Sequence, residues 1–212
     1  MLTVWGRRTS SNVQAVMWGI AELGLEYRRH DVGHRYGGTD TDAFGAMNPN
    51  RTVPVLQDGD DAPLWESAAI LRYLCNRYGK APFWPGDVSG RAQVDKWAEW
   101  AKINVGGAFT VPIFWRLVRT PEAKRDWPAI RAAVAALEAK LAIAEARLGQ
   151  GAYLAGEDFT LADVQFGHVL YRYYEIGIER ADLPNVARYY ERLQERPAYR
   201  EHVMVSYAEL AV

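Results

Sequence analysis

Residues 48–74 read NPNRTVPVLQDGDDAPLWESAAILRYL, and this stretch decides the fold class. The Asp58-Gly59 pair lies between two apolar pairs, Val55-Leu56 and Leu64-Trp65. An Asp-Gly pair between two such segments is typical of a tight turn in a short antiparallel β-hairpin. The segment therefore predicts two paired strands joined by a tight turn and followed by a helix.

The residues on either side of the hairpin define its ends. Pro54 follows Val53 just before the first strand, and it must stand at the strand's start because proline has no N–H for a β-ladder. After the second strand, Ser67 opens a run whose apolar residues recur at helical spacing. These apolar residues are Ile70, Leu71, Leu74, Cys75 and Tyr78. A free backbone edge next to a helix N-terminus is a suitable place to hold the carboxylate of a short peptide.

Several separate features occur in the order typical of one protein family. Asn48-Pro49 precedes Val53-Pro54, and Glu66-Ser67 follows about a dozen residues later, at the start of the apolar helix. A strand at 2–5, a Ser-rich turn and a helix open the chain, and FTLAD at 159–163 is similar to a helix-capping segment. Together these features cover nearly all 212 residues. The chain resembles the cytosolic glutathione S-transferases, in particular serine-type bacterial members similar to the theta, zeta and nu classes.

The resemblance implies an α/β domain followed by an all-α domain. The order strand, helix, strand, loop, hairpin, helix over residues 1–79 matches a thioredoxin-like fold, which would bind glutathione. Residues 80–88 contain two prolines and a glycine without periodicity, so we interpret them as a linker. Residues 89–212 are expected to form a helical-bundle domain that supplies most of the substrate pocket.

Three patterns predict helices in the second domain. Apolar residues recur every three or four positions over residues 130–148. Thr160 and Asp163 have the spacing of a capping box at a helix N-terminus. Pro184 and Pro197 each suit the first turn of a further helix.

Composition describes an ordinary globular protein, with 49% hydrophobic residues and a formal net charge of −1. The 25 basic and 26 acidic residues nearly balance, so no electrostatic feature favours nucleic acid or a membrane surface as a partner. The pairs Arg7-Arg8 and Arg28-Arg29 are expected to be solvated. No apolar run approaches the roughly 18 residues of a membrane span, and no secretory leader is visible. These observations predict a cytoplasmic protein.

Metal and thiol chemistry of the protein itself is not expected. The four histidines (His30, His34, His168 and His202) are scattered without metal spacing, so we interpret them as structural or surface residues. Cys75 is the one cysteine, which excludes an internal disulfide, and its place on an apolar helical face predicts a buried, inert thiol. The aromatic residues Trp97, Trp100, Phe109, Phe114 and Trp115 are expected to be mainly core, although they could line an apolar pocket.

The chemical task implied by the resemblance is to ionise the thiol of glutathione, the co-substrate. A thiol with a pKa of about 8.5 is only about 3% thiolate at pH 7. Lowering that pKa by two units requires a preference of roughly 2.7 kcal/mol for the anion. One or two hydrogen bonds to a charged acceptor, at about 1.5–3 kcal/mol each, are sufficient. A hydroxyl or amide donor before the first helix therefore meets the need without a strong base.

The turn Thr9-Ser10-Ser11-Asn12 contains such donors. By resemblance, Ser10 stands where serine-type family members place the hydroxyl that stabilises the thiolate. Ser11 and Asn12 follow in a turn similar to the Ser-Ser-Cys of the zeta class, with Asn12 in place of the cysteine. Ser10 is the first candidate and Asn12 its nearest competitor. The alternative is that these residues simply cap the helix, since Ser, Thr and Asn are favoured at helix starts.

The resemblance also implies residues that bind the rest of glutathione. Ser67, at a helix N-terminus, would donate to the γ-glutamyl carboxylate, and Glu66 would pair with the γ-glutamyl ammonium. Val53 would pair its backbone with the cysteinyl unit, and a cis peptide bond to Pro54 would turn that backbone outward. Arg51 replaces a smaller residue of the family, and both a contact with glutathione and a solvated side chain remain open.

The function implied is conjugation of the glutathione thiolate to a small hydrophobic electrophile, in a homodimeric detoxification enzyme. A second enzymatic interpretation is a glutathione-dependent disulfide reductase or isomerase on the same scaffold. A third is a non-catalytic glutathione-transferase-like interaction module.

Overall fold

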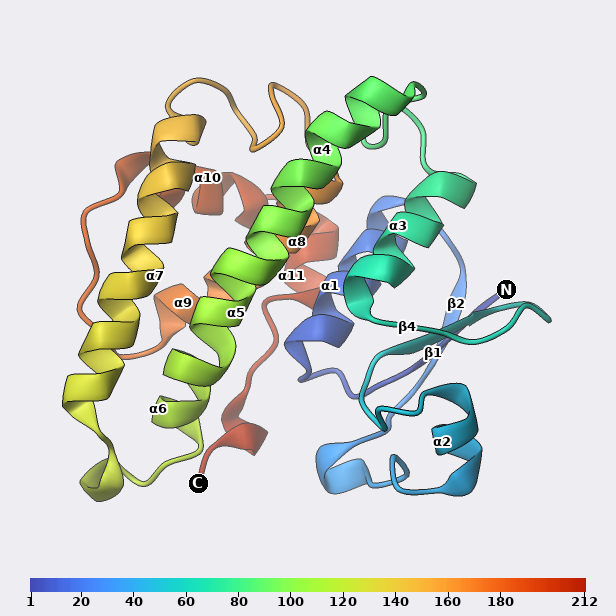
Figure 1. The fold of residues 1–212 in the computed structure, drawn as a ribbon, viewed down its shortest axis with the longest axis horizontal. Helices are drawn as coiled ribbons and strands as arrows, with labels where there is room; N and C mark the ends of the chain where they lie inside the picture. The colour runs from blue at the N-terminus through green and yellow to red at the C-terminus, as the bar shows by residue number, and fades with distance from the viewer.

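The N-terminal domain is built on one mixed sheet. The computed structural model describes residues 1–212, and Figure 1 shows the sheet beside a larger group of helices. The strands are β1 (Leu2–Trp5), β2 (Tyr27–His30), β3 (Val55–Asp58) and β4 (Leu64–Trp65). Their order is β2-β1-β3-β4, with β1 parallel to β2 and antiparallel to β3. This is the thioredoxin-like arrangement that the sequence predicts.

The predicted hairpin joins β3 to β4. Leu56 lies opposite Leu64 in antiparallel register, which confirms the pairing. The predicted tight turn is present, since the N–H of Asp61 donates to the carbonyl oxygen of Asp58 at 3.0 Å, but the connection is longer and runs over residues 59–63. Pro63 has no N–H to extend the ladder beyond Leu64, and Gly59 adopts a φ of 57° that starts the longer loop.

Three helices complete this domain: α1 (Ser11–Glu22), α2 (Asp42–Met47) and α3 (Ser67–Tyr78). In Figure 1, α1 and α3 lie on the side of the sheet nearer the helical domain, whereas α2 lies on the opposite side. The peptide bond between Val53 and Pro54 is cis, as the resemblance implies.

Helix α1 is enclosed by its neighbours. Every residue from Val13 to Ile20 is buried, and α1 packs against α3, α8 and α11. Gly19 permits the close approach to α3, since a Cβ at this position would lie 2.3 Å from Cδ2 of Leu71. A helix that is apolar on all sides is stable only where other elements surround it.

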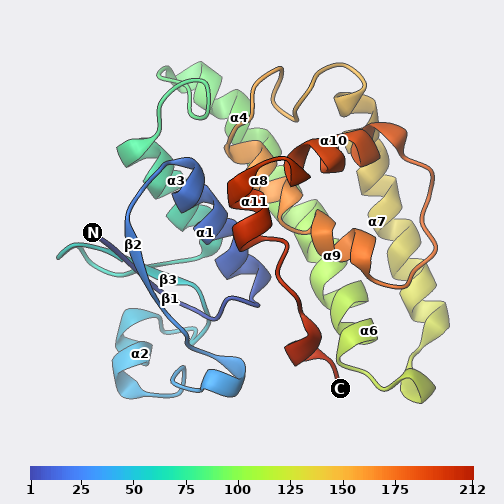
Figure 2. The same ribbon diagram turned by 180° about the vertical axis from the view of Figure 1, so that it is seen from behind.

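The remaining helices form the C-terminal domain. They are α4 (Val88–Trp100), α5 (Gly107–Phe109), α6 (Arg116–Val118), α7 (Trp127–Leu148), α8 (Leu161–Gly167), α9 (Leu170–Glu175), α10 (Pro184–Gln194) and α11 (Pro197–His202). Figure 2 shows the C-terminal segment returning from α11 toward α6. There the backbone N–H of Val212 donates to the carbonyl oxygen of Val118 at 3.2 Å.

Helices α4, α5 and α6 form one continuous rod, which runs beside α7 in Figure 1. Wider π-type turns interrupt the α-geometry at Ala101–Gly106 and Thr110–Trp115. Pro112 lies in the second of these turns and lacks the N–H of a regular helical residue, which favours a local departure from α-geometry. Both turns carry side chains that face the N-terminal domain.

The helix signals in the second half of the sequence are confirmed. The buried residues of α7 recur from Ile130 to Leu148. Thr160 and Asp163 form a complete capping box at the start of α8. Pro184 and Pro197 are the first residues of α10 and α11. None of the helices combines the length and the apolar character needed to cross a membrane.

The capping box generates a prediction about stability. Asp163 is fully buried, and its two oxygens accept from the N–H groups of Leu154 and Thr160 and from the hydroxyls of Thr160 and Tyr189. Asp163→Asn would turn an NH₂ group toward one pair of these donors. We expect the free energy of unfolding to fall by about 2–4 kcal/mol, measured by urea denaturation.

Asp158→Asn is the matched control, because Asp158 is exposed in the same loop. This control should change the free energy of unfolding by less than about 0.5 kcal/mol. An equally small effect for Asp163→Asn would contradict the role of the capping box.

Candidate active site

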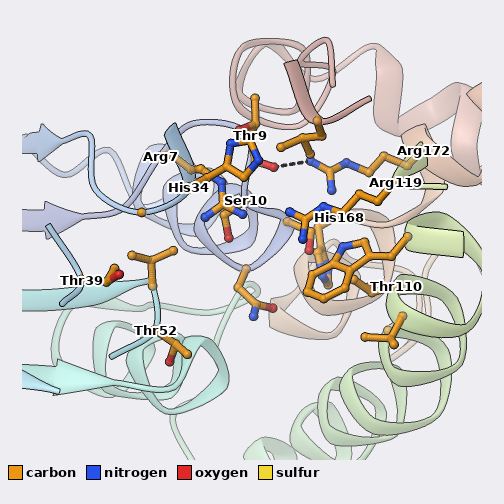
Figure 3. A pocket seen from close by; sticks show the side chains of 18 of the residues that line it. Arg7, Thr9, Ser10, His34, Thr39, Thr52, Thr110, Arg119, His168 and Arg172 are labelled. Carbon is orange, nitrogen blue, oxygen red and sulfur yellow. Dashed lines mark hydrogen bonds between the residues drawn. The ribbon is translucent and has the colours of Figure 1, made fainter. Parts of the chain in front are cut away.

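A cavity of about 480 Å³ opens between the start of α1 and the rod of α4 to α6 (Figure 3). One wall comes from residues within 7–12, 33–39 and 51–53, and the other from residues within 102–119, together with His168, Arg172 and Leu210. The cavity thus lies between the two domains. Of the residues predicted from the sequence, Ser10, Ser11, Asn12, Arg51 and Val53 line it, whereas Pro54, Glu66 and Ser67 do not.

Ser10 occupies the N-cap position of α1, but its hydroxyl makes no capping hydrogen bond. The helix begins instead through its carbonyl oxygen, which accepts from the N–H of Gln14 at 2.8 Å. Ser10 is 8% exposed, and its side chain lines the cavity (Figure 3). The capping interpretation is therefore wrong for this hydroxyl, which is free to donate to a ligand. Ser11, the first residue of α1, lines the same wall.

Lys102 connects two of the predicted residues. It lies on the first wide turn of the rod, and its Nζ donates to Oδ1 of Asn12 at 2.6 Å and to Oγ of Ser67 at 2.8 Å. An ammonium group can only donate, so Asn12 keeps its amide N–H groups and Ser67 keeps its O–H for a ligand. Ser67 is buried and does not line the cavity itself, but its hydrogen bond to Lys102, which does line it, connects the two.

The charge of Lys102 is not fully neutralised. Burial lowers the pKa of Lys102, and the carboxylates of Glu66 and Glu99 act in the opposite direction. None of the salt bridges within 4.0 Å includes Lys102. A partly buried ammonium group whose hydrogen-bond partners are both neutral attracts an anion.

The backbone of Val53 is open toward the cavity. Neither its N–H nor its C=O takes part in the hydrogen bonds that join the rest of the backbone. Arg51 is partly committed, because its guanidinium donates to the carbonyl oxygens of Thr39 and Thr41 at 3.3 and 2.8 Å. Arg51 therefore supports the loop before α2 and still lines the cavity.

Glu66 has an unusual backbone conformation. Its φ of 68° and ψ of 112° place a non-glycine residue in a sparsely populated region. Its carbonyl oxygen starts α3 by accepting from the N–H of Ile70 at 2.9 Å, and its side chain is exposed. Such conformations concentrate at ligand sites, where the surrounding structure holds them in place.

Sequence reasoning missed most of the basic side chains of the cavity. Arg7 was expected to be solvated together with Arg8; this is wrong for Arg7, which lines the cavity, and right for Arg8, which is exposed. Arg119 and Arg172 line the same space from the helical domain. No local pattern could have found these three residues, because they lie more than fifty positions apart and meet only through the fold.

His168 is also placed differently from the expectation of a purely structural residue. It is 2% exposed, lines the cavity, and its Nδ1 has no hydrogen-bond partner. Burial lowers the pKa of His168 to about 3, with a further contribution from the charge of Lys102, so the ring is neutral at pH 7.

The expectations for the cysteine and the aromatic residues are confirmed. Cys75 is fully buried, and burial raises the pKa of its thiol to about 12. Of the five aromatic residues considered, Trp115 lines the cavity and the others pack elsewhere. No group of three or more His, Cys, Asp or Glu side chains is arranged to hold a metal ion.

The comparisons with known proteins agree on one family. Two family models match: "Glutathione S-transferase, N-terminal domain" over residues 9–77, and "Glutathione S-transferase, C-terminal domain" over residues 108–197. Glutathione S-transferase GstB of Escherichia coli K12 is 37% identical over 206 residues, which cover 97% of this chain and 99% of the relative. The chain belongs to the glutathione S-transferase family.

Solved structures support the same assignment. The theta class glutathione S-transferase of the citrus canker pathogen Xanthomonas axonopodis pv. citri, with glutathione bound, is 44% identical with a TM-score of 0.91. That comparison covers 97% of this chain and 98% of the other. Glutathione transferase F7 from Populus trichocarpa is 25% identical with a TM-score of 0.86, over 97% of this chain and all of the other.

The free hydroxyl of Ser10 generates a prediction that separates a ligand role from a capping role. Ser10→Ala should change the free energy of unfolding by less than about 0.5 kcal/mol, because no capping bond is lost. Asp87→Ala should lower it by about 1 kcal/mol, since Asp87 accepts from the N–H of Gly90 at 2.8 Å as the N-cap of α4. Urea denaturation of both variants measures this. A loss near 1 kcal/mol for Ser10→Ala would restore the capping interpretation.

Proposed function

We propose that this protein is a glutathione transferase in which Ser10 stabilises the glutathione thiolate for attack on a small electrophile. One observation carries the proposal: a hydroxyl at the start of α1, without a protein partner, lines the same cavity as the open backbone of Val53. Membership of the glutathione S-transferase family supports it.

In this proposal, the glutathione peptide lies along the N-terminal domain. The free N–H and C=O of Val53 pair with the cysteinyl unit as in strand addition, next to the cis bond to Pro54. Arg51 lies at the side of the loop before α2, where it is suited to the glycine end.

The γ-glutamyl end is proposed to lie at the N-terminus of α3. Ser67 keeps a donor hydrogen, the helix dipole favours an anion, and Lys102 adds a positive charge. Glu66 is exposed beside them and can pair with the ammonium group of the γ-glutamyl unit. The γ-glutamyl carboxylate thus lies near a positive charge of the protein, and the γ-glutamyl ammonium lies near a negative one.

The electrophile is proposed to occupy the part of the cavity under the rod. Val111, Trp115 and Leu210 provide apolar contacts for the body of a small electrophile there. The reaction needs no covalent intermediate with the protein, because alignment of the thiolate and the electrophile supplies the rate enhancement.

The remaining proposals concern the domain boundaries, the oligomeric state, the location and the biological role of the protein. We propose domain boundaries at 1–79 and 89–212 with a linker at 80–88, and the gap between the end of α3 at Tyr78 and the start of α4 at Val88 supports them. We further propose a cytoplasmic homodimer with a role in detoxification, on the basis of the family. Analytical ultracentrifugation tests the dimer.

The proposed role of Ser10 predicts a change in the acidity of bound glutathione. Ser10→Ala should raise the pKa of the bound thiol by about one to two units, the value of one charge-assisted hydrogen bond. Glutathione affinity should change much less, because other residues hold the peptide. The ultraviolet absorbance of the thiolate, measured against pH, gives the pKa.

Asn12→Ala is the matched comparison, because Asn12 is the nearest competing donor. If Asn12→Ala raises the pKa of the bound thiol and Ser10→Ala does not, Asn12 is the residue that stabilises the thiolate. If neither variant moves the pKa, backbone N–H groups at the start of α1 hold the thiolate instead.

The bridge made by Lys102 predicts a loss of glutathione affinity. Lys102→Met keeps the length of the side chain but removes the charge beside Ser67 and Asn12. We expect the dissociation constant of glutathione to rise about ten-fold, equivalent to about 1.4 kcal/mol, in calorimetry. Lys96→Met is the control, because Lys96 is exposed on α4, does not line the cavity and donates its hydrogen bond to Gln93. Equal affinities for the two variants would remove Lys102 from the site.

A further inference from the structure

Three arginines, Arg7, Arg119 and Arg172, form a cluster in the cavity (Figure 3). Arg7 precedes α1, Arg119 follows α6 at the end of the rod, and Arg172 lies on α9. Arg172 is 2% exposed, and the other two are half-buried. Guanidinium groups keep their charge at neutral pH, so three positive charges face one another in this arginine cluster.

The arginine cluster is poorly satisfied by the protein. The side chains of Arg7 and Arg119 make no hydrogen bond or ion pair within the chain, and Arg172 donates only to the carbonyl oxygen of Thr9, at 2.7 Å. The Nε atom of each arginine is buried without a partner. Buried charged donors without acceptors are costly, and their retention indicates a partner from outside the chain.

Aromatic rings hold two of these arginines in place. Arg119 lies 4.3 Å from the ring centre of Trp115, and Arg172 lies 4.7 Å from that of Phe114. Cation–π contacts of this kind attract the charge and leave the N–H donors in the plane of the guanidinium free. The donors are thus positioned before any ligand arrives.

The protein supplies little counter-charge. Glu209 partly offsets the charge of Arg7, but its carboxylate pairs with Arg35 at 2.7 Å and also accepts from the hydroxyl of Thr9. It makes no salt bridge to any member of the arginine cluster. Burial and the charge of Arg7 together lower the pKa of Arg172 to about 10. An added anion would relieve this mutual repulsion.

Two members of the arginine cluster lie on the electrophile side of the cavity, and Arg7 lies beside Gly33, since a Cβ at Gly33 would be 3.3 Å from Nη1 of Arg7. In Figure 3, Ser10 stands between Thr39 and Thr52 on one side and Arg119 and Arg172 on the other. The proposed peptide site follows Thr52 and its neighbour Val53. A thiolate at Ser10 therefore has the glutathione peptide on one side and Arg119 and Arg172 on the other.

We infer that the electrophile carries a carboxylate, which the arginine cluster binds while the thiolate at Ser10 attacks the electrophilic carbon. This inference rests on the proposed function, because it names the class of substrate for the same site. The planar fork of an arginine matches the two oxygens of a carboxylate, so several unused N–H groups can bind one anion. The apolar body of the same molecule lies against Trp115.

Two electrophiles of equal shape test the inference: 4-chloro-3-nitrobenzoate, which is anionic, and 4-chloro-3-nitrobenzamide, which is neutral. In both, the glutathione sulfur bonds to the ring carbon that bears the chlorine, which is activated by the neighbouring nitro group. The C–Cl bond breaks, chloride leaves, and the thiol proton goes to water. Each kcat/KM is divided by the uncatalysed rate constant with glutathione, because the two rings differ in intrinsic reactivity. We expect this normalised value to be at least ten-fold higher for the benzoate.

Arg119→Gln and Arg7→Gln are the variants, and circular dichroism checks their fold. Either one should raise KM for the benzoate about ten-fold and lower the benzoate-to-benzamide ratio by a similar factor, and Arg119→Lys should recover part of the loss. Arg116→Gln is the control, because Arg116 is exposed one turn earlier and does not line the cavity. It should leave the ratio unchanged.

Two results would overturn the inference. One is a normalised ratio near one in the wild type. The other is an equal fall for both electrophiles in Arg119→Gln, which would mean that the arginine cluster acts on the thiolate and not on the electrophile. If the benzamide is conjugated without a preference for the benzoate, the proposed function stands and only the inference fails.

A binding measurement tests the anion site without requiring the conjugation reaction. The compounds 3-nitrobenzoate and 3-nitrobenzamide lack the chloride leaving group and are titrated calorimetrically into the protein with glutathione present. We expect 3-nitrobenzoate to bind at least ten-fold more tightly than 3-nitrobenzamide, and Arg119→Gln to abolish this difference. That result supports the anion site even if no conjugation is detected. In that case only the proposed function fails. Equal affinities for the two compounds would contradict the anion site.

Discussion

The burial of helix α1 on all sides is the constraint on which the site depends. Its residues from Val13 to Ile20 are enclosed by α3 of its own domain and by α8 and α11 of the helical domain. Because both domains hold this helix, its first turn has one position relative to each of them. Ser10, at that first turn, can therefore face the backbone of Val53 and the helical domain at the same time. A donor on a mobile loop could not be aligned with two substrates in this way.

Charge is distributed around Ser10 in two separate groups. Lys102 lies toward the N-terminus of α3, and the arginine cluster lies under the rod and α9. Formal net charge for the whole chain is only −1, so this concentration of positive charge is local. Glutathione as a thiolate is itself anionic, and the positive charge of Lys102 favours the ionised form because a partly buried cavity screens charges less than water does. The wide turns of the rod place Lys102 and Trp115 on the wall that faces α1.

Local patterns in the sequence predicted the elements that depend on neighbouring residues. The β3–β4 pairing, the capping box of α8 and the periodic face of α7 each follow from residues within one turn or one hairpin. The convergence of Arg7, Arg119 and Arg172 could not be predicted, because it results from packing between segments distant in the chain. The free hydroxyl of Ser10 was equally invisible, since a serine before a helix reads as a cap until the geometry is known. The hairpin loop is longer than Asp58-Gly59 suggests because Pro63 cannot join the ladder.

A crystal structure of the protein with glutathione bound tests the central claim most directly, namely that Ser10 separates the peptide site from Arg119 and Arg172. The account predicts that the glutathione sulfur lies within hydrogen-bond distance of the Ser10 hydroxyl, with the γ-glutamyl carboxylate near Ser67 and Lys102. It also predicts that neither glutathione carboxylate touches Arg119 or Arg172. A glutathione carboxylate bound by either of these arginines, or a sulfur placed away from Ser10, would contradict the account.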